Sequence, residues 1–295
     1  QIMPEARSVI VVALRIHRGS LRGIEEGTFF ANYTGMGYMS INWVFMPMLV
    51  RQLANLIEDE GYEAIPYGHQ SPWRAIDAEG EVQAKAHPVE PGRAVPDVAV
   101  HLRIAAYLAG LGEIGYSKVF LTPQFGPRQR LGIVLTEAEL EPDPLYDGPP
   151  LCNRCMACVR ECPGQAISGE KTVKVTLAGR EVEWGELDVA ACEIAFQGGK
   201  RLTDPDHEPV FLDEGMRGMP ITPNEVSPWA RKPGTNLLLG PGICGGRGCM
   251  RGCMITLEER GVVGNKFHEK FRRRKPWRMD WPVSPEEAGD PGKTD

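Results

Sequence analysis

Short apolar runs and an amphipathic segment alternate along the first part of the chain. The run SVIVVAL (8–14) is rich in Val and Ile and lies between polar residues, which predicts a buried β-strand. Apolar residues then repeat at helical spacing from Leu49 to Ile57, and Gly61 marks the end of the predicted helix. YEAIPYG (62–68) has the composition of the next strand. This alternation predicts a mixed fold of the α/β (α+β) class.

A second helix and a third strand are expected before a connector. PDVAVHLRIAAYLAG (96–110) places small and apolar residues along one side, with Asp97 as an acidic N-terminal cap. RLGIVLTEAEL (130–140) predicts a further strand, and the Pro- and Gly-rich EPDPLYDGPP (141–150) marks a boundary. We therefore expect a first domain over residues 1–145, a second over 146–270 and a basic tail over 271–295.

The overall composition changes this picture little. The chain has 295 residues, of which 42% are hydrophobic and 24% charged, enough for one large core or two smaller ones. Its net charge of -6 gives no reason to expect a nucleic acid or an anionic membrane as partner. The sequence has no apolar run of transmembrane length and no visible signal peptide. We expect a cytoplasmic protein, or an exported or membrane-associated one if a signal preceded Gln1.

The cysteines carry the strongest chemical signal. LCNRCMACVRECPGQAI (151–167) has the spacing C-x2-C-x2-C-x3-C-P of bacterial ferredoxins, in which three thiolates hold one [4Fe-4S] cluster and the fourth reaches a second cluster. A structural zinc site is the alternative, but zinc ribbons usually pair two separated C-x2-C knuckles. The eight cysteines are Cys152, Cys155, Cys158, Cys162, Cys192, Cys244, Cys249 and Cys253.

Eight cysteines are enough for two [4Fe-4S] clusters with none left over. The last three depart from the ferredoxin pattern, because their spacing is C-x4-C-x3-C and Met254 stands where a proline is usual. Other partitions of the eight ligands remain open. The crossing rule assigns Cys152, Cys155, Cys158 and Cys253 to one cluster and Cys162, Cys192, Cys244 and Cys249 to the other.

Residues 108–167 resemble the segment shared by corrinoid-dependent reductive dehalogenases and epoxyqueuosine reductases. The resemblance lies in LAGLGEIGY, TPQFGPR, a strand and the ferredoxin cysteines, and MPEARSVIVVAL (3–14) is also similar. It implies a nitroreductase-like core that binds base-off cobalamin, followed by a ferredoxin-like domain with two [4Fe-4S] clusters. The implied reaction passes electrons through both clusters to make Co(I), cleaves a carbon-halogen bond and protonates the carbon product.

Two details favour the dehalogenase side of this superfamily. Glu113 stands where dehalogenases tend to carry Glu and epoxyqueuosine reductases usually have Trp. The chain also ends soon after Cys253, without the helical-repeat domain by which the tRNA-modifying enzymes hold their substrate. We therefore expect an oxidoreductase, a reductive dehalogenase acting on a small organohalide, with a ferredoxin- or flavodoxin-type electron donor and no nucleic-acid partner.

Several alternatives stay open at this point. One alternative is an iron-sulfur electron-transfer subunit without a corrinoid. Another is a reductase of the epoxyqueuosine-reductase kind that acts on another small substrate. The sequence leaves the substrate undecided. A homo-oligomer and a membrane-anchor partner are both compatible with it.

The resemblance also implies residues at the reaction centre. Dehalogenases use a tyrosine assisted by a cation, and Tyr38 lies where that tyrosine is expected, with Tyr33 as a close rival. Epoxyqueuosine reductases use an aspartate that would align near Asp97, although a helix cap explains Asp97 equally well and core packing explains Tyr38. Either Arg128 or Arg130 supplies the cation. We predict catalytic roles for Tyr38, Asp97 and Arg128, and cofactor-binding roles for Gly110, Gly112, Glu113 and Arg130.

Three other features have simpler interpretations. His101 is a packed or surface residue of the second helix. GMGYMSINWVFMPM (35–48) is core, or the wall of an apolar substrate pocket. The basic and aromatic run at 271–281 is a solvated tail, or a docking surface for an acidic electron donor.

Overall fold

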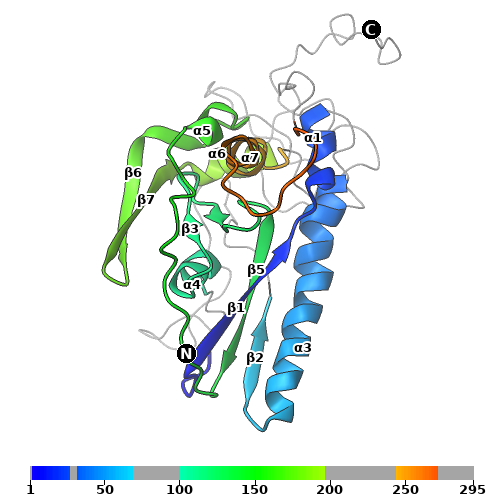
Figure 1. Cartoon of the computed structure of the whole chain (residues 1–295), viewed down its shortest axis with the longest axis vertical. Helices are drawn as coiled ribbons and strands as arrows, with labels where there is room; N and C mark the ends of the chain where they lie inside the picture. The colour runs from blue at the N-terminus through cyan, green and yellow to red at the C-terminus, as the bar shows by residue number, and fades with distance from the viewer. Residues whose placement is uncertain (1, 27–31, 69–99, 197–243, 272–295) are drawn as a thin grey trace, which may run out of the picture.

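A computed structural model describes residues 2–26, 32–68, 100–196 and 244–271 (Figure 1). Their centre is a three-stranded sheet with the order β1-β5-β2. Both β1 (Ser8–Arg15) and β2 (Ala64–Tyr67) pair antiparallel with β5 (Gln129–Thr136). Because every strand pair of this sheet is antiparallel, the mixed fold takes the α+β form of the predicted class.

Helices cover both faces of the sheet, which explains why β1 is a continuous apolar run. Val12 packs on one face with α3 (Met46–Asp59), and Val11 packs on the other face with α4 (Leu102–Leu108). Figure 1 shows the same layers, with α3 along one side of the sheet and α4 on the opposite side. A strand with helices on both faces buries successive side chains, so its sequence does not alternate.

The sequence predicted the first strand, the first long helix and the second strand with shifts of only a few residues. Gly61 has φ 89° one residue after the C-cap of α3, a conformation that favours glycine. The strand predicted over 130–140 begins at Gln129 but ends earlier, at Thr136.

The predicted start of the second helix was wrong. The structure begins α4 at Leu102, with His101 as its N-cap: the Nδ1 of His101 accepts the backbone N–H of Ile104 at 3.3 Å. Asp97, predicted as the cap and as a catalytic residue, lies outside the described residues. Imidazole therefore supplies the acceptor that a carboxylate was expected to supply.

A long hairpin between the ferredoxin cysteines and Cys192 was not predicted. It consists of β6 (Ile167–Leu177) and β7 (Arg180–Leu187). Trp184 of β7 packs in one apolar cluster with Ala106 of α4 and with a short strand pair, β3 (Glu113–Ile114) and β4 (Phe120–Leu121). This cluster joins the hairpin to the sheet layer that carries α4.

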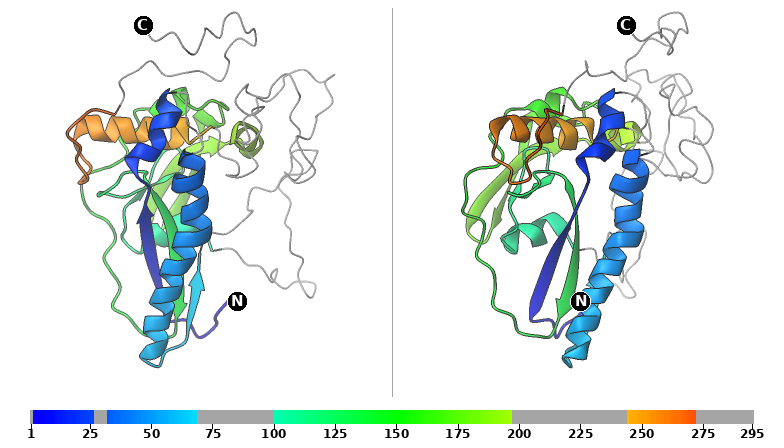
Figure 2. Two further views of the ribbon diagram at one scale, coloured as in Figure 1. Left: turned by 90° about the vertical axis from the view of Figure 1, so that its right-hand side faces the viewer. Right: turned by 45° about the vertical axis from the view of Figure 1, so that its right-hand side comes forward.

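The cysteine-bearing segments gather at the end of the sheet where β1 ends and β5 begins (Figure 2). Three π-helical segments lie among them, a conformation that is rare and frequently found at functional sites. The remaining elements are η1 (Arg18–Leu21), α1 (Arg22–Glu26), η2 (Tyr33–Met39), η3 (Ile41–Phe45), α5 (Ala157–Arg160), α6 (Val189–Phe196), η5 (Arg247–Gly252) and α7 (Cys253–Arg260).

The methionine- and aromatic-rich stretch at 35–48 is partly core and partly surface. Ile41 and Met46 are buried, whereas Trp43 and Phe45 are 52% and 45% exposed. Phe271, predicted to begin the tail, is instead buried in a core cluster and lies under the guanidinium groups of nearby arginines. The basic residues after it lie outside the described residues. Within the described ranges, no helix has the length and apolarity that crossing a membrane requires.

Candidate functional site

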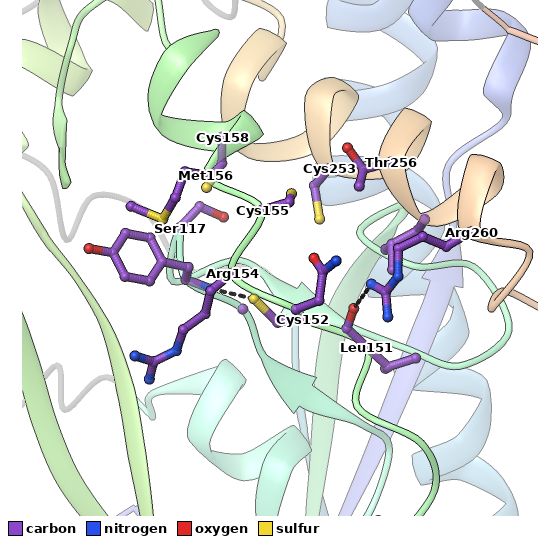
Figure 3. A pocket seen from close by; sticks show the side chains of 14 residues that line it. Ser117, Leu151, Cys152, Arg154, Cys155, Met156, Cys158, Cys253, Thr256 and Arg260 are labelled. Carbon is purple, nitrogen blue, oxygen red and sulfur yellow. Dashed lines mark hydrogen bonds between the residues drawn. The ribbon is translucent and has the colours of Figure 1, made fainter.

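Four cysteines surround one pocket at the end of the sheet. Cys152, Cys155 and Cys158 come from the loop leading into α5 and from α5 itself, and Cys253 begins α7. Figure 3 shows their side chains around a common hollow. Burial raises the pKa of the Cys158 thiol to about 11, and the neighbouring Cys152 and Cys155 add to this. Burial likewise raises the pKa of Cys253 well above its usual value, with contributions from the other three.

A second group of four cysteines is assembled from separate parts of the chain. Cys162 follows α5, Cys192 lies in α6, Cys244 precedes η5 and Cys249 lies within it. Burial raises the pKa of Cys244 well above its usual value, and the proximity of Cys249, Cys192 and Cys162 raises it further. Cys253 thus lies close to Cys152, Cys155 and Cys158, and Cys244 lies close to Cys162, Cys192 and Cys249, while the assignment of these cysteines to two clusters stays a prediction.

Residues of β3 and of the turn after it hold Cys152, the first cysteine of the first group. The Oε2 of Glu113 accepts the backbone N–H groups of Leu151 at 2.9 Å and Cys152 at 3.2 Å. The backbone N–H of Tyr116 donates to the Sγ of Cys152 at 3.4 Å. Glu113 was predicted to bind a cofactor, and in the structure its carboxylate orders the start of the cysteine loop.

Tyr116 also connects the two groups, a role that the sequence analysis did not recognise. Its buried ring packs in one cluster with cysteines of both groups, including Cys158 and Cys162. Its hydroxyl donates to the carbonyl of Ser168 at 3.0 Å, and the hydroxyl of Ser117 donates to the carbonyl of Cys249 at 3.4 Å. The position of this tyrosine in GLGEIGY was the signal that could have identified it.

Backbone conformation and close packing explain why glycine stands at the two predicted cofactor-binding positions, Gly110 and Gly112. Gly110 has φ 73°, and a Cβ there would lie 2.0 Å from the carbonyl oxygen of Pro144. Gly112 has φ 153°, and its Cβ would lie 2.0 Å from the carbonyl oxygen of Leu121. Each glycine therefore allows two backbone segments to approach closely.

Tyr33 and Arg130 form a pair beside the second cysteine group. The Nη2 of Arg130 donates to the hydroxyl of Tyr33 at 3.0 Å, and its guanidinium carbon lies 4.5 Å from the centre of the Tyr38 ring. A Cβ on Gly246, between two cysteines of that group, would lie 3.7 Å from the hydroxyl of Tyr33. Burial raises the pKa of Tyr33 to about 12, although Arg130 opposes this rise. The predicted donor Tyr38 and its rival Tyr33 therefore share one arginine.

Arg128, predicted to be catalytic, makes its contacts elsewhere. Its buried guanidinium donates to the carbonyl of Ile16 at 2.8 Å and to the Oδ1 of Asn265 at 2.7 Å. It also lies 5.3 Å from the ring centre of Phe267. These contacts join the end of β1 to the segment after α7, and Arg130 is the arginine that meets the tyrosines.

Across the described ranges, no three His, Cys, Asp or Glu side chains are arranged to hold a single metal ion. The cysteines of each group lie around a common space, and backbone N–H groups donate hydrogen bonds to two of the sulfur atoms. The N–H of Tyr116 donates to Cys152, and the N–H of Ala166 donates to the Sγ of Cys162 at 3.5 Å. Such hydrogen bonds are among those that tune the potentials of iron-sulfur clusters.

Comparison with known proteins gave relatives but no matching family model. The tetrachloroethene reductive dehalogenase of Desulfitobacterium hafniense is 44% identical over 72 residues, which are 24% of this chain and 13% of that protein. The epoxyqueuosine reductase of Listeria monocytogenes is 28% identical over 176 residues, 57% of this chain and 38% of that protein. The solved catabolic reductive dehalogenase NpRdhA aligns with a TM-score of 0.43 and 20% identity over 65% of this chain and 24% of its own.

The chain thus spans 13% of the dehalogenase and 38% of the epoxyqueuosine reductase. Both names denote reductases, which are oxidoreductases. The sequence relatives come from the two families that residues 108–167 resemble. These similarities relate the chain to the superfamily of reductive dehalogenases and epoxyqueuosine reductases.

Proposed function

We propose that the chain forms the reducing centre of a cobalamin-dependent iron-sulfur enzyme that removes halogen from a small organohalide. The observation that carries the proposal is the position of the Tyr33–Arg130 pair beside a group of four cysteines, with a second such group beyond it. The dehalogenase relative supports the reaction class. Electrons would enter from a ferredoxin- or flavodoxin-type donor.

The cysteines would hold two [4Fe-4S] clusters. The first, held by Cys152, Cys155, Cys158 and Cys253, would occupy the pocket of Figure 3, and the second would receive its electrons. The second group adjoins Tyr33, so it is the one placed to reduce a group bound near the tyrosines. This arrangement supports one direction of electron flow, from the first group through the second to the reaction site.

Two side chains carry buried polar atoms that a bound corrinoid would satisfy. The Nε of Arg130 is buried and has no hydrogen-bond partner among the described residues, and both polar side-chain atoms of Asn42 in η3 are in the same condition. Buried polar groups without partners are costly unless a ligand or water satisfies them. Bound cobalamin would supply the strongly reducing metal centre needed to break a carbon-halogen bond.

The chain's own residues would protonate the carbon product. We assign the donor to the tyrosine pair and its cation to Arg130 in place of Arg128. Tyr33 accepts a hydrogen bond from Arg130 and keeps its own proton available, whereas Tyr38 meets Arg130 through its ring face. The charge of Arg130 would stabilise the phenolate left after proton transfer.

Anaerobic reconstitution with iron, sulfide and cobalamin tests the proposal. We expect about eight irons and about one cobalt per chain, and chloride release from tetrachloroethene in a single turnover with reduced ferredoxin. Tyr33→Phe and Tyr38→Phe, checked for full iron and cobalt content, then identify the donor by the loss of product. About eight irons without cobalt would overturn the enzyme proposal and leave an electron-transfer subunit.

Reduction of epoxyqueuosine or a similar substrate is the second candidate. The epoxyqueuosine reductase relative aligns over 57% of this chain, more than the 24% for the dehalogenase. The same reconstituted protein should therefore be given an epoxyqueuosine-containing tRNA stem loop in parallel with the organohalide. Product from the stem loop alone, lost in Asp97→Asn, would favour this candidate over dehalogenation.

A further inference from the structure

A buried ionic network lies where the two cysteine groups meet. The side chain of Arg251 is fully buried, and its Nη1 donates to the Oε2 of Glu25. Its Nη2 donates to the Oε2 of Glu161 at 2.6 Å. Glu25, on α1, is itself only 2% exposed. Taking these charges out of water is costly, so the network persists only if the three side chains keep their mutual geometry.

Two members of this network, Arg251 and Glu161, each lie in the sequence between a cysteine of one group and a cysteine of the other. Arg251 lies midway between Cys249 of the second group and Cys253 of the first. Glu161 lies between Cys158 of the first group and Cys162 of the second. The chain passes from one group to the other twice, and the Arg251–Glu161 ion pair joins the two crossings.

The backbones of these crossings are also in close contact. A Cβ on Gly248 would lie 2.4 Å from the carbonyl oxygen of Cys158 and 2.6 Å from the backbone N of Cys162. A Cβ on Gly252 would lie 3.5 Å from the carboxyl carbon of Glu161. The ion pair therefore links two backbone segments that already approach within van der Waals distance.

We propose that Arg251, paired with Glu161 and Glu25, is a positioning residue that fixes the two cluster sites relative to each other and tunes the potentials of both clusters. This inference rests on the proposed two-cluster function. Glu25 connects the crossings to α1, so the N-terminal part of the chain takes part in the same constraint. A change of charge here acts on both clusters, because net charge near a cluster is one determinant of its potential.

The test compares Arg251→Met and Glu161→Gln with Arg7→Met, a control in an ion pair whose side chains are 65% and 82% exposed. All variants are reconstituted anaerobically, and iron content, redox titration and electron paramagnetic resonance of the fully reduced protein are measured. We expect Arg251→Met to lower the cluster potentials and Glu161→Gln to raise them. Both should lose spin coupling between the clusters relative to wild type, and Arg7→Met should match wild type.

Opposite shifts in potential are a signature that a merely structural role would not produce. If Arg251→Met fails to take up iron, Glu161→Gln decides alone, because its amide keeps the shape of the carboxyl. Unchanged coupling and potentials in a Glu161→Gln protein that carries both clusters would overturn the inference and leave the proposed function intact. A wild-type protein that never assembles two clusters would overturn both.

Discussion

The two cysteine groups serve one proposed purpose but are built in different ways. Three members of the first group, from Cys152 to Cys158, lie within seven residues, and the Glu113 carboxylate and the Tyr116 N–H hold the start of that loop. The second group takes its members from separate segments, and beside it lie Tyr33 and its partner Arg130. The first is a local motif completed by one distant residue, whereas the second exists only after the chain has folded.

The two groups therefore depend on different contacts for the positions of their cysteines. A local loop keeps its ligand spacing as long as its own backbone hydrogen bonds are made. A group gathered from distant segments depends on every contact that brings those segments together, so changes remote from the cysteines should affect it more. The following changes test the comparison.

The largest effect is expected from removing a ligand of one group. Cys158→Ala should abolish the first cluster and Cys249→Ala the second, so each variant should fall from about eight irons to about four. The spectra of the remaining clusters should differ, because each variant keeps the cluster that the other loses. Each variant thus serves as the control for the other. Complete loss of iron in both would show that neither group assembles alone.

Gly248→Ala should affect both groups together. Its Cβ would meet backbone atoms of Cys158 and Cys162, and such overpacking typically costs about 1–3 kcal/mol of the free energy of unfolding. Gly19→Ala is the matched control, because nothing lies within 4 Å of a Cβ at that position. Thermal unfolding and iron content of both variants give the comparison. Equal stability of the two would contradict the close approach of the crossings.

Glu113→Ala should act on the first group alone. It leaves the N–H groups of Leu151 and Cys152 without their acceptor, a loss of about 1–3 kcal/mol for buried groups. Glu113→Gln should restore part of this, since its amide oxygen still accepts. We expect the spectrum of the first cluster to change while that of the second stays constant. Glu139→Ala, at an exposed ion pair, is the control.

The smallest effect concerns His101, far along the chain from either group. Partial burial of its ring, followed by the charges of Arg103 and Lys118, lowers its pKa below the ordinary value of 6.5. The neutral ring caps α4, so this contribution to stability is complete above pH 6.5 and is lost as the pH falls through the lowered pKa. The change should be under about 1 kcal/mol. Chemical unfolding measured from pH 7.5 to pH 5 checks it.

His101→Asn separates titration from capping, because asparagine is a good N-cap without a charge change in this range. That variant should lose the His101 part of the pH dependence, whereas His268→Asn, at an exposed histidine, should keep it. The iron content of both should equal that of wild type. A slope that persists in His101→Asn would assign it to another group.

Sequence reasoning succeeded where the signal is local. The Val- and Ile-rich run of β1, the helical repeat of α3 and the glycine after it can each be recognised within a few residues. The ferredoxin spacing is an equally local signal, because three thiolates on a short loop already define most of one ligand set, and the cluster it indicates stays a prediction. Residues a few positions apart have few possible arrangements, so pattern and composition are enough to predict them.

Only the tertiary structure decided the contacts between distant segments. Arg128 lies just before β5 and Arg130 lies within it, yet Arg128 joins Ile16 to Asn265 whereas Arg130 meets Tyr33. The pairing of Arg251 with carboxylates from two distant parts of the chain has no sequence signature. Such contacts depend on how helices and strands pack, and packing is a property of the whole core that spacing along the chain does not encode.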